Sequence, residues 1–170
     1  MLTKIMNTKV IILIIFSLFF TTSISASEEL VIEIDNPKFS EKGLNDKIYE
    51  IKAKKGLKLD DELELFTVEG KFKSEKNGKW IYLEAEKGSF SQITNFIELE
   101  KNIIFYTDEG EKVTSSFATF DMTDDIIELN ENVSHQTNEG IILSDKSIIT
   151  NNFSKISYIG NVVSTFYNTK

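Results

Sequence analysis

The chain of 170 residues contains no cysteine, one histidine (His135) and one proline (Pro37). Without cysteine it can form neither a disulfide scaffold nor a thiolate nucleophile. A single histidine and no cysteine leave too few of the ligands that transition metals prefer. We therefore expect no metal site and no cofactor.

Positive charge is scarce as well. The 19 basic residues are all lysines, and 27 acidic residues outnumber them. Residues 1–26 contain Lys4 and Lys9 and no acid, so the rest of the chain has 17 lysines against 27 acids, a net charge of −10. This charge repels phosphate backbones and anionic membrane surfaces, which argues against nucleic-acid binding. Hydrophobic residues make up 41% of the chain, enough to build a core.

The N-terminus lacks a long hydrophobic run. The apolar stretch at residues 10–20 is shorter than the roughly 20 residues of a membrane-spanning helix. Small residues at 25–27 follow it, as in a cleaved signal peptide. An uncleaved anchor over residues 10–26 is a competing interpretation, and a buried helix of a cytosolic protein is a third. We expect a membrane anchor or signal peptide with one short hydrophobic helix (residues 1–28), followed by an exported domain (residues 29–170).

The remaining chain alternates apolar and polar residues, as in "YEIKA" (49–53), "IYLEA" (81–85) and "IIELN" (126–130). This period of two is typical of antiparallel strands with one face buried and the other in water. Turn-forming clusters separate the strands at short intervals, which predicts an all-β sandwich or barrel. The single proline, Pro37, indicates an edge or a strand end, because it cannot donate to a β-ladder.

One pattern occurs three times, as "IELEKNIIF" (97–105), "IELNENVSH" (127–135) and "ISYIGNVVS" (156–164). Each copy has an asparagine at the same place, and this residue tolerates the positive φ of a tight turn. A unit of two or three strands cannot bury its apolar face alone, whereas stacked units can. We therefore predict an elongated two-sheet β-structure of stacked units, with small residues at the corners and asparagine or glycine at the turns. The aligned asparagines are Asn102, Asn132 and Asn161, and the aligned small residues are Gly88, Ala118 and Ser147.

Three segments carry a resemblance to a known family. They are "IDNPKFSEKGLNDKIYEIKAKKG" (34–56), "GKWIYLEAEKGSFSQITNFIELEKNIIFYTDEG" (78–110) and "VTSSFATFDMTDDIIELNENV" (113–133). Over about residues 31–167 the chain resembles the periplasmic lipopolysaccharide-export protein C family. The resemblance implies an open β-jellyroll, shared with the A, D, F and G proteins of the same export system. It also implies a single-pass anchor in the inner membrane with the main domain in the periplasm; a soluble periplasmic protein is the alternative if the leader is cleaved.

The resemblance implies that the domain carries lipopolysaccharide from the inner-membrane ABC transporter to the next bridge protein. Exposing one acyl chain of about a dozen methylenes to water costs roughly 10 kcal/mol, at ~0.8 kcal/mol per methylene. A jellyroll with splayed sheets can shield such chains, and it needs no catalytic group because the ATPase supplies the work. On residues alone, plain core is the favoured interpretation of these inward positions, and only the resemblance favours contact with lipid. The expected groove residues are Ile51, Leu83, Phe90, Ile97, Leu99, Ile103, Phe120, Ile127, Leu129 and Val133.

The two ends of the domain are expected to dock partners. An open jellyroll leaves edge strands unpaired, and such edges accept an added strand. The first strand (residues 30–39) is expected to meet the transporter's jellyroll, and the last (residues 157–167) the soluble bridge protein A. The expected edge residues are Val31, Ile32 and Ile34 at the first edge, and Tyr158, Val162 and Val163 at the last. Two alternatives remain open: bridge protein A itself, and a structural β-repeat module without lipid cargo.

Catalytic residues are not expected. The acid pairs at residues 60–61 and 124–125 fall at predicted hairpin turns, where neighbouring side chains point apart, so they make a poor general acid–base pair. His135 occupies the repeat position of Phe105 and Ser164, and we expect it at a solvated strand end. Trp80 is expected to pack at the start of a strand, with partner docking as an alternative. We therefore expect a protein that is not an enzyme.

Overall fold

The computed structural model describes residues 30–42, 48–74, 78–151 and 153–168. The segment of the expected anchor or signal peptide lies outside these residues. The described part of the chain contains no helix of the length and apolarity that crossing a membrane requires. Its strands are β1 (Ile32–Asp35), β2 (Lys38–Lys42), β3 (Ile48–Leu59), β4 (Glu62–Lys73), β5 (Trp80–Ser91), β6 (Phe96–Thr107), β7 (Lys112–Asp121), β8 (Ile126–Gln136), β9 (Gly140–Thr150), β10 (Lys155–Ile159) and β11 (Val163–Phe166).

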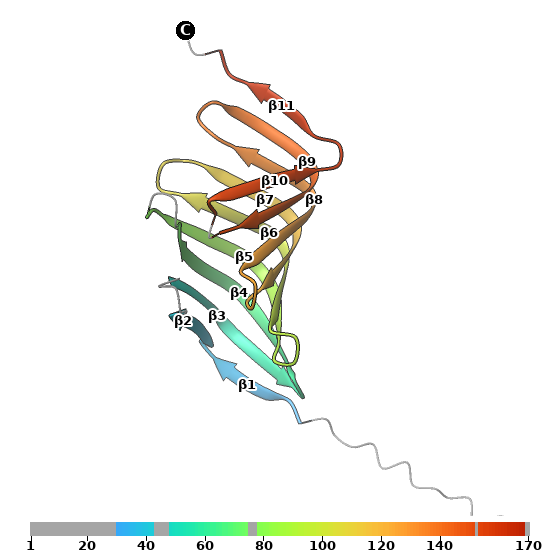
Figure 1. The fold of residues 1–170 in the computed structure, drawn as a ribbon. Coiled ribbons are helices and arrows are strands. Elements are labelled where there is room, and N and C mark those ends of the chain that lie inside the picture. The colour runs from blue at the N-terminus through green and yellow to red at the C-terminus, as the bar shows by residue number, and fades with distance from the viewer. Residues whose placement is uncertain (1–29, 43–47, 75–77, 152, 169–170) are drawn as a thin grey trace, which may run out of the picture.

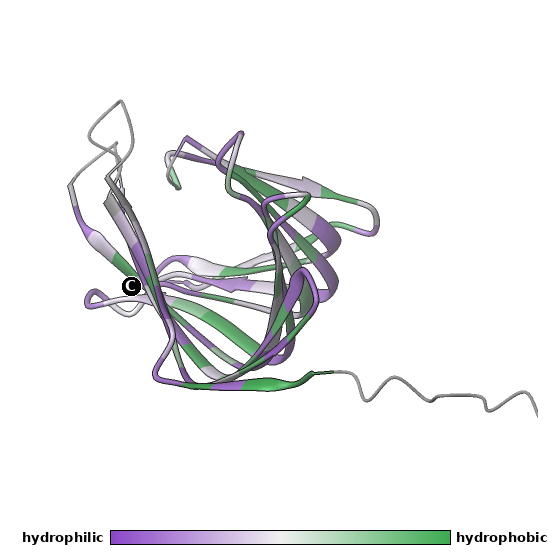
Figure 2. Ribbon diagram, turned by 90° about the horizontal axis from the view of Figure 1, so that it is seen from below, coloured by the Kyte–Doolittle hydropathy of each residue, from purple (hydrophilic) through white to green (hydrophobic). Residues whose placement is uncertain are grey.

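All eleven strands belong to one antiparallel sheet in which chain neighbours from β3 to β10 are also sheet neighbours. Figure 1 shows the strands stacked from β1 at one end to β11 at the other. Viewed along this direction, from the β1 end, the ribbon traces an open, curved outline (Figure 2). The predicted all-β fold, an elongated open jellyroll of antiparallel strands, is confirmed. The two predicted layers are two halves of a single bent sheet.

Bulges produce the bend. The register shifts in mid-strand between β5 and β6, β6 and β7, β7 and β8, and β8 and β9. A bulge bends its strand and increases the local twist. Because the bulges recur on neighbouring strands, each long strand contributes one half to each of two facing arms. Arm A contains the strand halves beside the turns β3–β4, β5–β6, β7–β8 and β9–β10. Arm B contains those beside the turns β4–β5, β6–β7 and β8–β9, together with the first half of β3 and its partner β2.

The repeated asparagines lie at these bends and not at the predicted reversals of the chain. Asn102 and Asn132 have φ angles of 53°, inside strands β6 and β8. In the third copy the positive φ, 92°, belongs to Gly160, just before Asn161. Each asparagine donates its side-chain amide to the residue 16 positions earlier, on a neighbouring strand of the sheet: to Glu86, Ser116 and Asp145, respectively. The repeat therefore specifies a bend at which the asparagine side chain forms a hydrogen bond to the neighbouring strand.

A row of alternating small and large residues runs across arm A. The pairing places Gly88 between Leu65 and Leu99, and Ala118 between Leu99 and Leu129. Ser147 follows beside Leu129. A side chain at Gly88 has no room, because a Cβ atom there would lie 2.8 Å from the Glu98 carbonyl oxygen and 3.0 Å from Leu99. Small residues between leucines let the leucine side chains fill the interior without collision, which explains the small positions that recur in the sequence.

Candidate functional site

The interior between the arms contains all ten expected groove residues. Nine are buried core residues, and Phe90 is partly buried against them. They form cross-strand rows: Phe90, Ile97, Phe120 and Ile127 are consecutive neighbours across β5 to β8. The predicted inward orientation of these side chains is therefore confirmed, and their contact with lipid stays a prediction.

Aromatic side chains join the two arms across this interior. Phe120 of arm A lies 5.7 Å from Phe72 and 5.6 Å from Tyr49 of arm B, in edge-to-face geometry. Phe39 and Phe90 make a second contact between the arms, with ring centroids 5.0 Å apart. Each such pair stabilises the folded protein by about 0.5–1.5 kcal/mol, in addition to the contribution of the apolar surface that it buries. The interior is thus closed by contact, and the expected apolar slot is not open from end to end.

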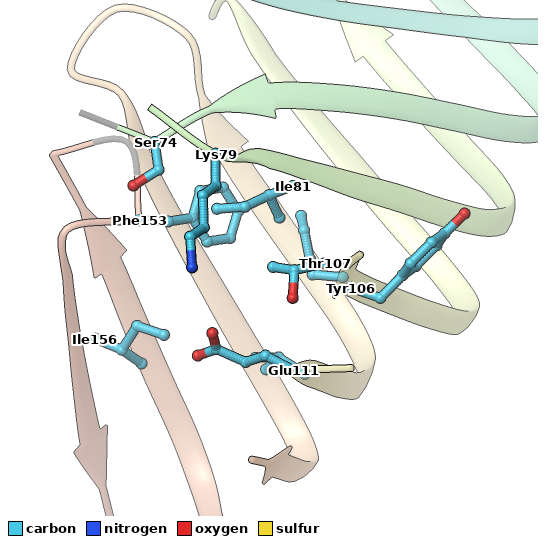
Figure 3. Close-up of a pocket in the computed structure, with 10 residues that line it drawn as sticks. Ser74, Lys79, Ile81, Tyr106, Thr107, Glu111, Phe153 and Ile156 are labelled. Carbon is cyan, nitrogen blue, oxygen red and sulfur yellow. The ribbon is translucent and has the colours of Figure 1, made fainter. Parts of the chain in front are cut away.

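A pocket remains beside the turns of arm B, and we call it the rim pocket (Figure 3). It has a volume of about 130 Å³, which corresponds to roughly four water molecules. Figure 3 shows the charged ends of Lys79 and Glu111 reaching into the same space. Its apolar walls are Ile81, Phe105, Val113, Phe153 and Ile156, and its polar lining is Ser74, Lys79, Tyr106, Thr107 and Glu111.

His135 differs from its prediction, because it is buried and bonded at both ring nitrogens. Only 6% of its surface is exposed. Its Nε2 lies 2.8 Å from Glu111, and its Nδ1 contacts the hydroxyl of Tyr158 on β10. A neutral ring satisfies both contacts if the Tyr158 hydroxyl donates to Nδ1 and Nε2–H donates to Glu111. Burial, together with the negative charge of Glu111, raises the pKa of Tyr158 to about 12. The network therefore fastens strand β10 to the interior.

Both edges of the sheet consist of two short strands, although one strand was predicted at each edge. β1 and β2 both pair with β3, and β10 and β11 both pair with β9. The first break falls at Asn36 and Pro37, which confirms the edge position predicted for the proline, and the second follows Gly160. Each break divides an edge into two short segments, which reduces the length of exposed backbone that wrong partners can use.

The outermost strand β11 has backbone groups that face away from the sheet. The Tyr167 amide donates to the Glu139 carbonyl, at 2.8 Å. Bonded and non-bonded pairs alternate along an antiparallel ladder, so Val163 and Thr165 direct their backbone groups toward β9. Ser164 and Phe166 direct theirs outward. Apolar side chains are exposed at both edges, including Leu30, Val31 and Ile32 at the first, and Ile159, Val162, Val163 and Phe166 at the last.

Opposite charges pair across neighbouring strands on the outer face. Lys38 lies 3.0 Å from Glu50, and Lys52 lies 2.9 Å from Glu69. The hydrogen bond from Lys38, helped by the charges of nearby lysines, lowers the pKa of Glu50. The bond to Glu69 raises the pKa of Lys52. These exposed pairs contribute little stability, but they favour one strand register.

The acid pairs occupy the hairpin turns where they were predicted. Asp60 and Asp61 form the β3–β4 turn, and Asp124 and Asp125 lie in the β7–β8 turn. Within residues 30–42, 48–74, 78–151 and 153–168, no group of three His, Cys, Asp or Glu side chains could hold a metal ion. Trp80 begins β5, as expected, and Lys71 lies 5.3 Å from its ring centroid, a cation–π contact.

Of the aromatic residues that close the interior, Phe90 and Phe120 were expected groove residues, whereas Phe72, Phe105 and Phe153 were not. Phe72 and Phe105 follow the strand alternation, so a search for inward-facing aromatic residues would have found them. Phe153 lies in a turn between β9 and β10, and no periodic signal marks it.

The fold and interior define the class of this protein: an open β-jellyroll with an apolar interior and two unpaired sheet edges. No protein-family model matches the chain, and no curated protein matches it.

Proposed function

We propose that the protein is a periplasmic component of lipopolysaccharide export. It receives lipopolysaccharide from the inner-membrane ABC transporter, shields the acyl chains between its arms and passes the molecule to the next bridge protein. The observation that carries this proposal is the bent single sheet, whose apolar interior lies between two arms and whose two edges are unpaired. The sequence resemblance to export protein C supports the same assignment.

The closed interior is compatible with this cargo on energetic grounds. Five aromatic pairs cross between the arms: Phe39–Phe90, Tyr49–Phe120, Phe72–Phe120, Phe72–Phe153 and Phe105–Phe153. At about 0.5–1.5 kcal/mol each, their specific geometry contributes roughly 2.5–7.5 kcal/mol. Burying one acyl chain of about a dozen methylenes recovers roughly 10 kcal/mol. A chain can therefore replace these contacts, and the arms close again when it leaves.

The edges supply the route in and out. A partner strand added to β10 and β11 would use the outward backbone groups of Ser164 and Phe166, and its side chains would meet the exposed apolar residues of that edge. We assign this edge to bridge protein A. The opposite edge, formed by β1 and β2, would meet the transporter's jellyroll. Continuous sheet across the partners keeps one apolar interior running through the assembly.

Photo-crosslinking in cells tests the cargo. A crosslinker at Leu99 or Phe120, both buried between the arms, should capture lipopolysaccharide. A crosslinker at Glu84 or Glu128 on the outer face should not. Equal capture from both faces, or none from either, would mean that the inward residues are plain core.

A structural β-repeat module without cargo is a second candidate, and the closed aromatic contacts favour it. Such a protein needs a packed interior and no opening of the arms. It would show no lipid capture at any interior position, while retaining partner binding through its edges.

A further inference from the structure

The side chain of Phe153 lies between the rim pocket and the groove residues. Phe153 lines the rim pocket and also a second, smaller pocket of about 10 Å³. The second pocket is bounded by Phe120 and Ile127, which belong to the expected groove. Among the described residues, no other one lines both pockets. Phe153 is therefore the partition between the rim and the interior.

The backbone of Phe153 is held in an unusual conformation. Its φ angle is 64°, which is uncommon and strained for a bulky residue. Its ring lies 5.6 Å from Phe72 and 5.4 Å from Phe105, both in arm B. The turn of arm A thus places an aromatic ring against the facing arm and stores strain in doing so.

The rim pocket also contains an unsatisfied polar group. The hydroxyl oxygen of Thr107 is buried and has no hydrogen-bond partner among the described residues. A buried hydroxyl without a partner destabilises the folded protein, so the site favours a ligand that accepts a hydrogen bond there. The neighbouring walls are apolar, with Phe105, Val113 and Ile156 among them. The chemistry fits an acyl chain whose ester or amide carbonyl accepts a hydrogen bond from Thr107.

We propose that the rim pocket is the insertion site for one acyl chain, and that Phe153 is the gate between this site and the interior. This inference rests on the proposed function and adds to it the place of insertion and the residue that controls it. The pocket of about 130 Å³ holds only a short part of a chain. A longer chain advances when the Phe153 ring turns away from Phe72 and Phe105, which joins the two pockets. The carbonyl stays at Thr107, and the polar head stays outside, beside Lys79 and Glu111.

Binding of cis-parinaric acid, a fluorescent fatty acid, to the full-length chain tests the gate. Phe153→Ala removes the partition, so no binding energy is used to displace the ring, and we expect about tenfold tighter binding than in the wild type. Phe117→Ala is the matched control, because Phe117 lies on β7 but lines neither pocket. It should leave the affinity unchanged. Equal affinity in the wild type and Phe153→Ala, or a similar gain in both variants, would overturn the gate.

The Thr107→Val variant tests whether the Thr107 hydroxyl contributes to ligand binding, independently of its effect on the stability of the folded protein. The variant removes the buried unsatisfied hydroxyl, so the folded protein should be at least as stable as the wild type. Its affinity for the methyl ester of the same fatty acid should fall about fivefold, because the ester carbonyl loses its donor. Unchanged affinity would overturn the role of Thr107. If the wild type and both pocket variants bind neither probe and Leu99 crosslinks no lipopolysaccharide, the proposed cargo itself fails. If Leu99 crosslinks lipopolysaccharide and the pocket variants behave like the wild type, only the insertion site fails.

Discussion

The row of alternating small and large residues across arm A can be tested by exchanging one small residue with the large residue opposite it. Ala118 and Leu129 are direct cross-strand neighbours, and neither has any exposed surface. Leu129→Ala removes buried methyl groups and should cost about 2–5 kcal/mol of unfolding free energy. Ala118→Leu overfills the same layer and should cost about 1–3 kcal/mol. Independent effects would therefore add to roughly 3–8 kcal/mol, a large part of the total stability of a domain.

The double variant should cost less than this sum. A leucine at 118 can occupy the space vacated at 129, because directly opposed Cβ atoms lie about 4.5–5.5 Å apart. We expect a favourable coupling of about 1–3 kcal/mol, measured by urea unfolding of the two single variants and the double variant. The control pairs Ala118→Leu with Leu65→Ala, which lies in the same row three strands away, a distance of roughly 14 Å. That pair should be additive. Additivity within about 0.5 kcal/mol in both pairs would refute the row as a packing unit.

Three further predictions concern the edges and the N-terminus. Ser164→Pro removes an outward backbone donor, so it should abolish binding of bridge protein A with little loss of stability. Val163→Pro is the control, because it removes a donor directed toward β9 and should lower the unfolding free energy by about 1 kcal/mol or more. Wild-type affinity of Ser164→Pro for bridge protein A would exclude the C-terminal edge as the docking site. The pKa of Tyr158 is raised to about 12 in the folded protein, against about 10 in an unfolded chain, so the stability that the neutral phenol contributes is present below about pH 10 and is lost as the pH rises toward about 12. Tyr158→Phe should show less of this alkaline loss in urea unfolding at about pH 9 and pH 11.5; an identical loss in both proteins would show that other groups cause it. Intact-mass measurement of the protein from membranes should give the uncleaved chain if residues 10–26 are an anchor, and a mass beginning near Ala26 or Glu28 would show that the leader is removed.

Much of the fold could be predicted because its signals are local. The alternation of inward and outward residues specifies strands, and it identified groove positions such as Leu99 and Ile127 that the structure buries. The repeat showed that the strands stack. Pro37 marked an edge, because its ring removes one backbone donor.

The remaining features depend on contacts between residues far apart in the chain. The sequence shows that Asn102 and Asn132 tolerate positive φ. It does not distinguish a turn from a bulge within a strand, because asparagine suits both. The predicted exposure of His135 was wrong because its partners are distant in the chain. Glu111 lies 24 residues before it and Tyr158 lies 23 after it, and only the pairing of β7 through β10 brings them together. Phe153 could not be found, since a turn residue carries no facing pattern. The closure of the interior follows from aromatic contacts between the two arms, which no single strand encodes.

Depletion of the protein in the cells that produce it tests the proposed function most directly, with lipopolysaccharide measured separately in the inner and outer membranes. If the protein carries lipopolysaccharide across the periplasm, newly made molecules should accumulate at the inner membrane, and the surface content should fall. Restoring the wild-type chain should reverse both changes, and restoring the Ser164→Pro variant should not. Normal delivery of lipopolysaccharide to the cell surface after complete depletion would contradict the account.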